Sequence, residues 1–236
     1  MFPETRRSVL ERVQSDDTDS RRAAFGDLTT GYWRPAYQYL RLHWHLSAED
    51  AEDVVQSFFA TAFEKQYLEK YDASQARFRT FLRVCLDRFV QNTQKSERAA
   101  KRGGGATILS LDFPGAERDL ASLPTVIGDA ERFFHDETVR ALFARAVDAL
   151  RRRLADEQRH AVFAVFEQHD LQPTADTSYA SIARALNVTV TQVTNHLHTA
   201  RRLFRECALA ELRAISATDA EYRDEARALF GAEVES

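Results

Sequence analysis

Apolar residues recur with the period of an α-helix along most of the 236-residue chain. From Phe78 to Val90 they occupy every third or fourth position, which places them on one face of a helix, and Val54 to Phe63 follows the same pattern. The chain has only 8 glycines and 5 prolines, which argues against a β-sandwich. The sequence therefore predicts an all-α protein.

Local signals indicate where several helices begin. Ser47, with Asp50 three residues later, is similar to a capping box before the Val54 stretch. Pro35 suits the first turn of a new helix, where its missing N–H costs nothing. Phe78 opens the next helix.

Composition divides the chain into segments. Three consecutive glycines, 103–105, end the first helical block, because glycine is costly in a helix. The following stretch contains Pro114 and Pro124 and reads as a flexible linker with a few apolar residues that could dock. A second helical block follows, broken by a polar loop from His169 to Thr177. The predicted segments are 1–22 (N-terminal), 23–102 (helical domain), 103–135 (linker), 136–206 (second helical domain) and 207–236 (acidic C-terminal extension).

The second block contains a helix-turn-helix pattern. Asn187 occupies the tight turn, where a left-handed conformation is needed. Thr189 and Gln192 form a capping box for the second helix. We expect Tyr179, Ile182, Ala183 and Leu186 on the inner face of the first helix, and Val190, Val193, Leu197, Ala200 and Phe204 on the buried face of the second.

The other side of that second helix carries hydroxyl, amide, imidazole and guanidinium groups, which contact phosphates and base edges when a helix enters the major groove. From Thr189 to Arg205 there is no acidic residue. An αα-hairpin that only packs is the alternative interpretation of this pattern. The candidate DNA-contacting residues are Thr191, Gln192, Asn195, His196, Thr199, Arg201 and Arg202.

Charge is distributed in blocks that the net charge of −4 conceals. Glu49 to Glu64 carries five acids and no base, whereas Arg77 to Arg102 carries eight bases and two acids. Residues 189–205 add three bases, and residues 206–236 hold eight acids against three bases. Because local potential governs association, this alternation indicates surfaces with different partners.

Two runs, DAEDVVQSFFATAFEK and YDASQARFRTFLRVCLDRFVQNTQKSERAAKRGGG followed by LSLD, strongly resemble region 2 of bacterial RNA polymerase sigma factors of the extracytoplasmic-function type in the sigma-70 superfamily. The helix-turn-helix resembles region 4 of the same family, and the resemblance extends over nearly the whole chain. It implies two small helical domains, a region 2 bundle and a region 4 helix-turn-helix, joined by a flexible linker. It also implies that the chain binds core RNA polymerase, through the β′ clamp helices and the β flap, and directs promoter-specific initiation.

The resemblance assigns roles to three sets of residues. The docking face for the clamp helices would be Asp50, Glu52, Asp53 and Gln56. The contacts to the −10 element and its melted strand would be Arg79, Arg83, Arg88, Asn92, Gln94, Lys95, Arg98, Lys101 and Arg102. The helix from Thr191 to Arg202 would read the −35 element, although relatives often carry an arginine near Thr199. Phe78, Phe81 and Phe89 are expected in the core rather than on DNA.

Other classes of function are less favoured. The chain has no P-loop, GxSxG or HExxH pattern, so no enzymatic activity, catalytic residue or cofactor is expected. His43 with His45 and His196 with His198 are two residues apart, which suits metal binding poorly, so no metal site is expected. No apolar run approaches the roughly 20 residues of a membrane span and no signal peptide is apparent, which favours a cytoplasmic protein without membrane contact.

Two questions stay open at the level of sequence. The main alternative function is a stand-alone helix-turn-helix transcriptional regulator, in which the N-terminal block serves dimerisation or sensing. The regulatory partner could be an anti-sigma factor or a Ser/Thr kinase acting on the docking helix, where Ser57 and Thr61 lie. Unchanged polymerase binding and transcription after a phosphomimetic substitution would count against the kinase.

Overall fold

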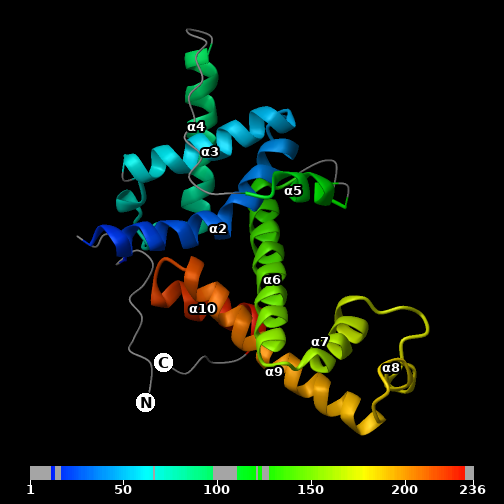
Figure 1. Ribbon diagram of the computed structural model, residues 1–236. Helices are drawn as coiled ribbons and strands as arrows, with labels where there is room; N and C mark the ends of the chain where they lie inside the picture. The colour runs from blue at the N-terminus through cyan, green and yellow to red at the C-terminus, as the bar shows by residue number, and fades with distance from the viewer. Residues whose placement is uncertain are drawn as a thin grey trace. The chain divides into compact units, whose positions relative to one another are not determined.

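The computed structural model describes residues 12–13, 17–65, 67–97, 111–120, 122–123 and 128–231. Within these ranges every regular element is helical, as predicted (Figure 1). The α-helices are α2 (Thr18–Leu42), α3 (Ala48–Glu64), α4 (Phe78–Glu97), α5 (Phe113–Leu120), α6 (Ala130–Asp156), α7 (His160–Phe166), α8 (Tyr179–Ala185), α9 (Val190–Ile215) and α10 (Asp219–Phe230). A 3-10 turn, η1 (Tyr67–Lys70), follows α3, and a π-helical turn, η2 (Glu167–Leu171), follows α7.

The chain divides into two compact units. The first comprises residues 1–141 together with 212–236, and the second comprises residues 142–211. This division differs from the predicted segments, because the C-terminal extension contributes most of its length to the first unit. Helices α6 and α9 each supply residues to both units.

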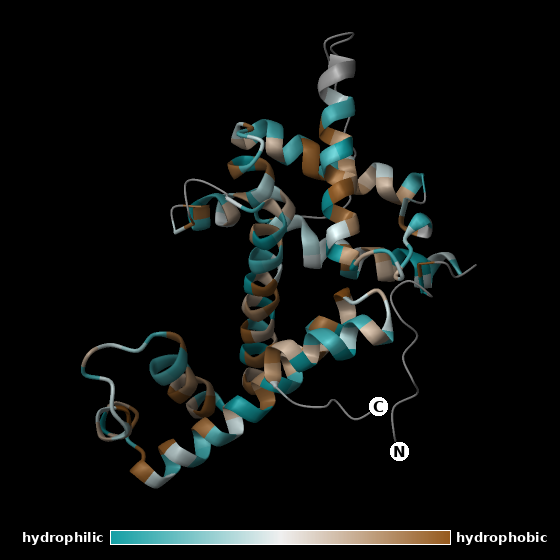
Figure 2. Cartoon of the chain, turned by 180° about the vertical axis from the view of Figure 1, so that it is seen from behind, coloured by the Kyte–Doolittle hydropathy of each residue, from teal (hydrophilic) through white to brown (hydrophobic). Residues whose placement is uncertain are grey.

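The core of the first unit lies between α2, α3 and α4. Tyr39, Phe58, Phe78 and Leu86 are fully buried there, and burial of each Phe or Leu side chain stabilises the fold by about 1.5–3 kcal/mol. The apolar stripes predicted on α3 and α4 supply much of this core, and Figure 2 shows apolar and polar residues alternating along α4. Ser47 caps α3 by accepting the backbone N–H of Asp50 at 3.1 Å, as its spacing predicts.

One predicted helix start is wrong. Pro35 lies inside α2, which continues from Thr18 to Leu42. A proline inside a helix costs about 3 kcal/mol. Tyr32, Ala36 and Tyr39 around it are all buried, so tertiary packing on both sides of Pro35 outweighs that cost.

The predicted linker 103–135 contains an ordered, docked helix. In α5, Phe113 is buried against Trp33 and Tyr37 of α2, with ring centroids 5.3 Å apart in both pairs. Glu117 accepts two hydrogen bonds from Arg41, from Nε at 2.9 Å and from Nη2 at 2.5 Å. Helix α6 then begins at Ala130, inside the same predicted linker. Apolar burial and this ion pair therefore hold part of the segment against α2.

The second unit contains the helix-turn-helix, with a core formed by Val165, Ile182, Ala183, Val193 and Leu197. Asn187 has φ of 52°, the left-handed conformation predicted for the turn. The predicted capping box is also present, since Thr189 Oγ1 accepts the N–H of Gln192 at 3.1 Å and Gln192 Oε1 accepts the N–H of Thr189 at 2.8 Å.

Two residues assigned to the inner faces of these helices are instead on the surface. Val190 is 48% exposed and Tyr179 is 38% exposed. Each is the first residue of its helix, and because side chains on a helix lean toward its N-terminus, these two project beyond the helix's own apolar face. Tyr179 packs beside His169, with ring centroids 5.3 Å apart.

Candidate nucleic-acid and polymerase interfaces

The acidic face of α3 is accessible. Asp50 and Asp53 are exposed, whereas Glu52 and Gln56 are half-buried at the edge of the helix. Asp50 also accepts a hydrogen bond from the Ser47 hydroxyl at 2.7 Å, so it serves partly as a local cap. Glu52 and Asp53 form no ion pair with any other described residue. Their charges are therefore available to a basic partner.

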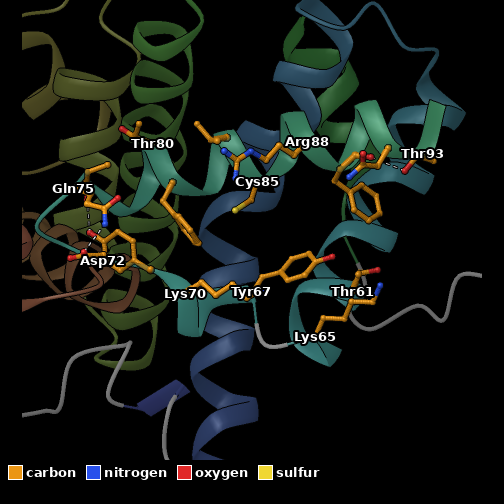
Figure 3. Close-up of a pocket in the computed structure, with 16 residues that line it drawn as sticks. Thr61, Lys65, Tyr67, Lys70, Asp72, Gln75, Thr80, Cys85, Arg88 and Thr93 are labelled. Carbon is orange, nitrogen blue, oxygen red and sulfur yellow. Dashed lines mark hydrogen bonds between the residues drawn. The ribbon is translucent and has the colours of Figure 1, made fainter. Parts of the chain in front are cut away.

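A groove of about 840 Å³ opens between the end of α3, η1 and α4 (Figure 3). Its charged lining is basic apart from Asp72, and its apolar lining is largely aromatic. The lining includes Lys65, Tyr67, Lys70, Phe81, Arg88 and Asn92.

The side of the groove formed by η1 combines a ring and a cation. The Lys70 ammonium lies 5.9 Å from the centroid of the Tyr67 ring. The adjoining loop is ordered by Asp72, which accepts hydrogen bonds from the Ser74 backbone N–H at 2.9 Å and from Gln75 Nε2 at 2.8 Å. A hydrogen bond from the Ser74 hydroxyl at 2.7 Å, together with these two, lowers the pKa of Asp72, so the carboxylate stays ionised and holds the loop shape.

The opposite side of the groove is the exposed face of α4, from which Cys85 and Arg88 project (Figure 3). Arg88 is exposed and forms no ion pair among the described residues. Burial raises the pKa of the Cys85 thiol, which is therefore neutral at pH 7. Phe78 lies in the core as predicted, whereas Phe81 and Phe89 are only half-buried and line the groove.

Two arginines assigned to −10 DNA are held inside the first unit. Arg79 pairs with the buried Glu225 of α10. Arg83 donates to Asp87 at 2.7 Å and to Glu131 at 2.9 Å. Their side chains are 15% and 18% exposed, so neither projects as a free contact to phosphate. The basic block did not reveal the pairs with Glu225 and Glu131, because these carboxylates come from other helices. The Arg83–Asp87 pair follows the i, i+4 spacing within α4 and could have been found from sequence.

Asp87 connects Arg83 to the end of α2. Its Oδ1 accepts hydrogen bonds from the Tyr39 hydroxyl at 3.0 Å and from Trp44 Nε1 at 2.9 Å. Burial, together with the charge of Asp87, raises the pKa of Tyr39 to about 12, so the phenol remains a donor. This network fixes Arg83 in a structural role.

The remaining −10 candidates divide into three cases. Asn92 is exposed and lines the groove beside Arg88. Gln94 and Lys95 lie on α4, but the structure does not describe their side chains. Arg98, Lys101 and Arg102 lie outside the described residues.

The outer face of α9 is polar, as predicted. Thr191, Gln192 and Asn195 are exposed, and His196 and Thr199 are half-buried. The Gln192 side chain is engaged in the capping box and is therefore fixed rather than free to search for a base edge.

The arginines of this face are neutralised, which sequence analysis missed. Arg201 donates to Asp170 of η2, from Nε at 2.8 Å and from Nη2 at 2.7 Å. Arg202 donates to Glu206 at 2.5 Å, one helical turn further on, and Arg205 is also engaged. The Glu206 pair follows the ordinary i, i+4 spacing and could have been found from sequence. The Asp170 pair depends on the π-helical turn that brings η2 beside α9.

No group of three or more His, Cys, Asp or Glu side chains in the described ranges is arranged to hold a metal ion. Among the described helices, none combines the length and apolarity needed to cross a bilayer. Comparison with models of protein families, with curated proteins and with solved structures found no match.

Proposed function

We propose that this chain is a sigma factor that binds bacterial core RNA polymerase and directs promoter-specific transcription initiation. In this proposal the first unit carries the region 2 functions and the second unit carries the region 4 functions. The groove beside α4 is the observation that carries the proposal. It combines aromatic rings, amide and hydroxyl groups and unpaired cations on one surface, as a melted DNA strand requires.

The chemistry of the groove suits an unstacked base better than a duplex. Tyr67 and Phe81 offer ring faces on which a base can stack, and such stacking contributes about 1–3 kcal/mol per base. Asn92 offers both a donor and an acceptor to a base edge. Lys65, Lys70 and Arg88 supply positive charge for the phosphates along the same strand.

The acidic face of α3 complements this assignment. Glu52 and Asp53 sit on the same helix whose last turn borders the groove, so one rigid element would hold a basic protein partner at its start and DNA near its end. We assign that partner as core polymerase. The polar face of α9 would then contact duplex DNA at the −35 element.

Thr61 lies on the groove, and Ser57 is half-buried one turn earlier on α3. Phosphorylation of Thr61 would place negative charge where DNA phosphate is proposed to bind. A Ser/Thr kinase therefore remains a proposed regulator, and an anti-sigma factor that covers the groove or the α3 face is the other.

The test is run-off transcription with reconstituted core polymerase and the full chain, followed by mapping of start sites. The expected result is stoichiometric binding to core polymerase and initiation at defined promoters that depends on the added chain. Tight, specific binding of the free chain to duplex operator DNA without any capture of core polymerase would instead support the stand-alone regulator.

A further inference from the structure

The C-terminal helix α10 docks on the start of α4 through two carboxylates. Glu221 Oε1 accepts the backbone N–H of Phe78, the first residue of α4, at 2.9 Å. Its Oε2 accepts the N–H of Ala217, just before α10, at 3.0 Å. One side chain thus satisfies an otherwise unpaired backbone donor at the start of α4 and fixes the entry into α10.

Glu225 follows one turn later and is buried. It accepts hydrogen bonds from Arg77 and from Arg79, both through Oε1. The carboxylate is only 7% exposed, whereas the Arg77 side chain is 48% exposed and reaches it from the surface. Two cations at the start of the basic block are therefore engaged by one acid from the C-terminal extension.

Further contacts hold α10 in this position. Ala226 is completely buried, and the Tyr32 hydroxyl donates to the carbonyl of Ile215 at 3.3 Å. Arg213 lies over the Tyr222 ring at 4.8 Å and pairs with Asp219 at 2.7 Å. The extension is thus an integral part of the first unit and not a loose acidic tail.

We propose that α10 is an intramolecular cover that occupies Arg77 and Arg79 and competes with nucleic-acid phosphate for them. Carboxylate and phosphate bind a guanidinium group in the same way, so phosphate must displace Glu225 to gain these contacts. In this state the groove cations, including Arg88, remain available to DNA, whereas Arg77 and Arg79 are engaged by Glu225. The identification of the competing ligand as promoter DNA rests on the proposed function.

The experiment compares two neutralising substitutions on α10 in the full chain. Glu225→Gln removes the charge that holds both arginines, whereas Asp224→Asn removes a neighbouring exposed charge that pairs with Arg227 at 4.0 Å. Both raise the net charge by one.

Affinity for a fluorescein-labelled single-stranded oligonucleotide is measured by anisotropy across a salt series. We expect Glu225→Gln to bind more tightly and to steepen the slope of log K against log salt by about 0.7–1.4, which corresponds to one or two extra phosphate contacts. Asp224→Asn should match the wild type.

Equal effects of the two substitutions on affinity, or no oligonucleotide binding by any variant, would overturn the proposal that α10 is a cover.

Hydrogen exchange on the wild-type chain gives a second measurement that needs no substitution. The amides of α10 should exchange faster when the oligonucleotide is bound, and unchanged exchange in α10 with DNA bound would refute displacement. Core polymerase binding separates the two proposals. If the chain binds core polymerase but Glu225→Gln does not change oligonucleotide affinity, the proposal that α10 is a cover is refuted and the sigma-factor proposal stands. If Glu225→Gln raises the affinity but the chain does not bind core polymerase, the sigma-factor proposal is refuted and the cover proposal stands.

Discussion

Asp170 holds Arg201 through two parallel hydrogen bonds, from Nε at 2.8 Å and from Nη2 at 2.7 Å. The pair joins η2 to the polar face of α9, and it lowers the pKa of Asp170 below its usual range. A bidentate geometry of this kind is what a DNA phosphate would offer the same guanidinium. The second unit therefore presents its proposed DNA-contacting face with this cation already occupied.

Asp170→Asn should increase the electrostatic attraction of α9 for duplex DNA, because it removes the carboxylate that neutralises Arg201. We expect tighter non-specific binding at low salt and a salt slope steeper by about 0.9, equivalent to one added phosphate contact. Anisotropy with a labelled duplex measures both. The control is Asp176→Asn, an exposed loop position with the same change in charge. An equal gain in the control would show a general charge effect and contradict the role of Asp170.

Asp53→Arg should abolish binding to core polymerase without unfolding α3, since Asp53 is exposed and forms no ion pair among the described residues. Capture of the full chain on immobilised core polymerase is the measurement, with circular dichroism to confirm helix content. Glu64→Arg is the matched control, because it reverses a charge in the last turn of the same helix, where a cation is favoured by the helix dipole. Retained capture by Asp53→Arg would refute the assignment of the α3 face.

Arg88→Gln should weaken binding of a single-stranded oligonucleotide and reduce the salt slope by about 0.7, because Arg88 is an exposed cation of the groove. The matched control is Arg118→Gln on α5, an exposed arginine outside the groove. The measurement is the affinity of each variant for the oligonucleotide across a series of salt concentrations. If Arg118→Gln has the larger effect, the groove is not the principal DNA-binding surface.

The docking of α5 should depend on pH through Glu117. Hydrogen bonds from Arg41 lower the pKa of Glu117, so the carboxylate is more acidic in the folded chain than in the unfolded one. Its contribution to docking is therefore present above the unfolded value of about 4.3 and is lost as pH falls through the lower folded value. The fluorescence of Trp33, which packs on Phe113, reports the release in a Trp44→Phe background. Glu117→Gln should remove this pH-dependent change in fluorescence. If the change persists in that variant, it arises from the titration of another group.

Features determined by neighbouring residues were predictable from sequence. The stripes of α3 and α4, the Ser47 cap and the Thr189–Gln192 capping box all depend on spacings of three or four residues, and the structure contains each of them. The left-handed Asn187 belongs to the same group. These signals were sufficient for the helical class and for the faces that α3 and α9 expose.

Features that depend on distant partners were not predictable in the same way. Arg79 lies in a basic block, yet its partner Glu225 is 146 residues away. Arg201 likewise pairs with Asp170 across 31 residues. Segment charge identifies where cations are concentrated, but only tertiary packing decides which of them are already neutralised. The docking of α5 and the continuation of α2 through Pro35 are decided by packing in the same way.

The cap that Glu221 supplies to α4 also has a consequence for how the protein is made. The Glu221 carboxylate and the Phe78 N–H from which it accepts a hydrogen bond are 143 residues apart, so the contact closes about three-fifths of the 236-residue chain. During translation α4 leaves the ribosome long before its cap exists, and Arg77 and Arg79 remain without Glu225 over that interval. The first unit can therefore be completed only after synthesis has reached the C-terminal residues, and contacts of such long range form slowly.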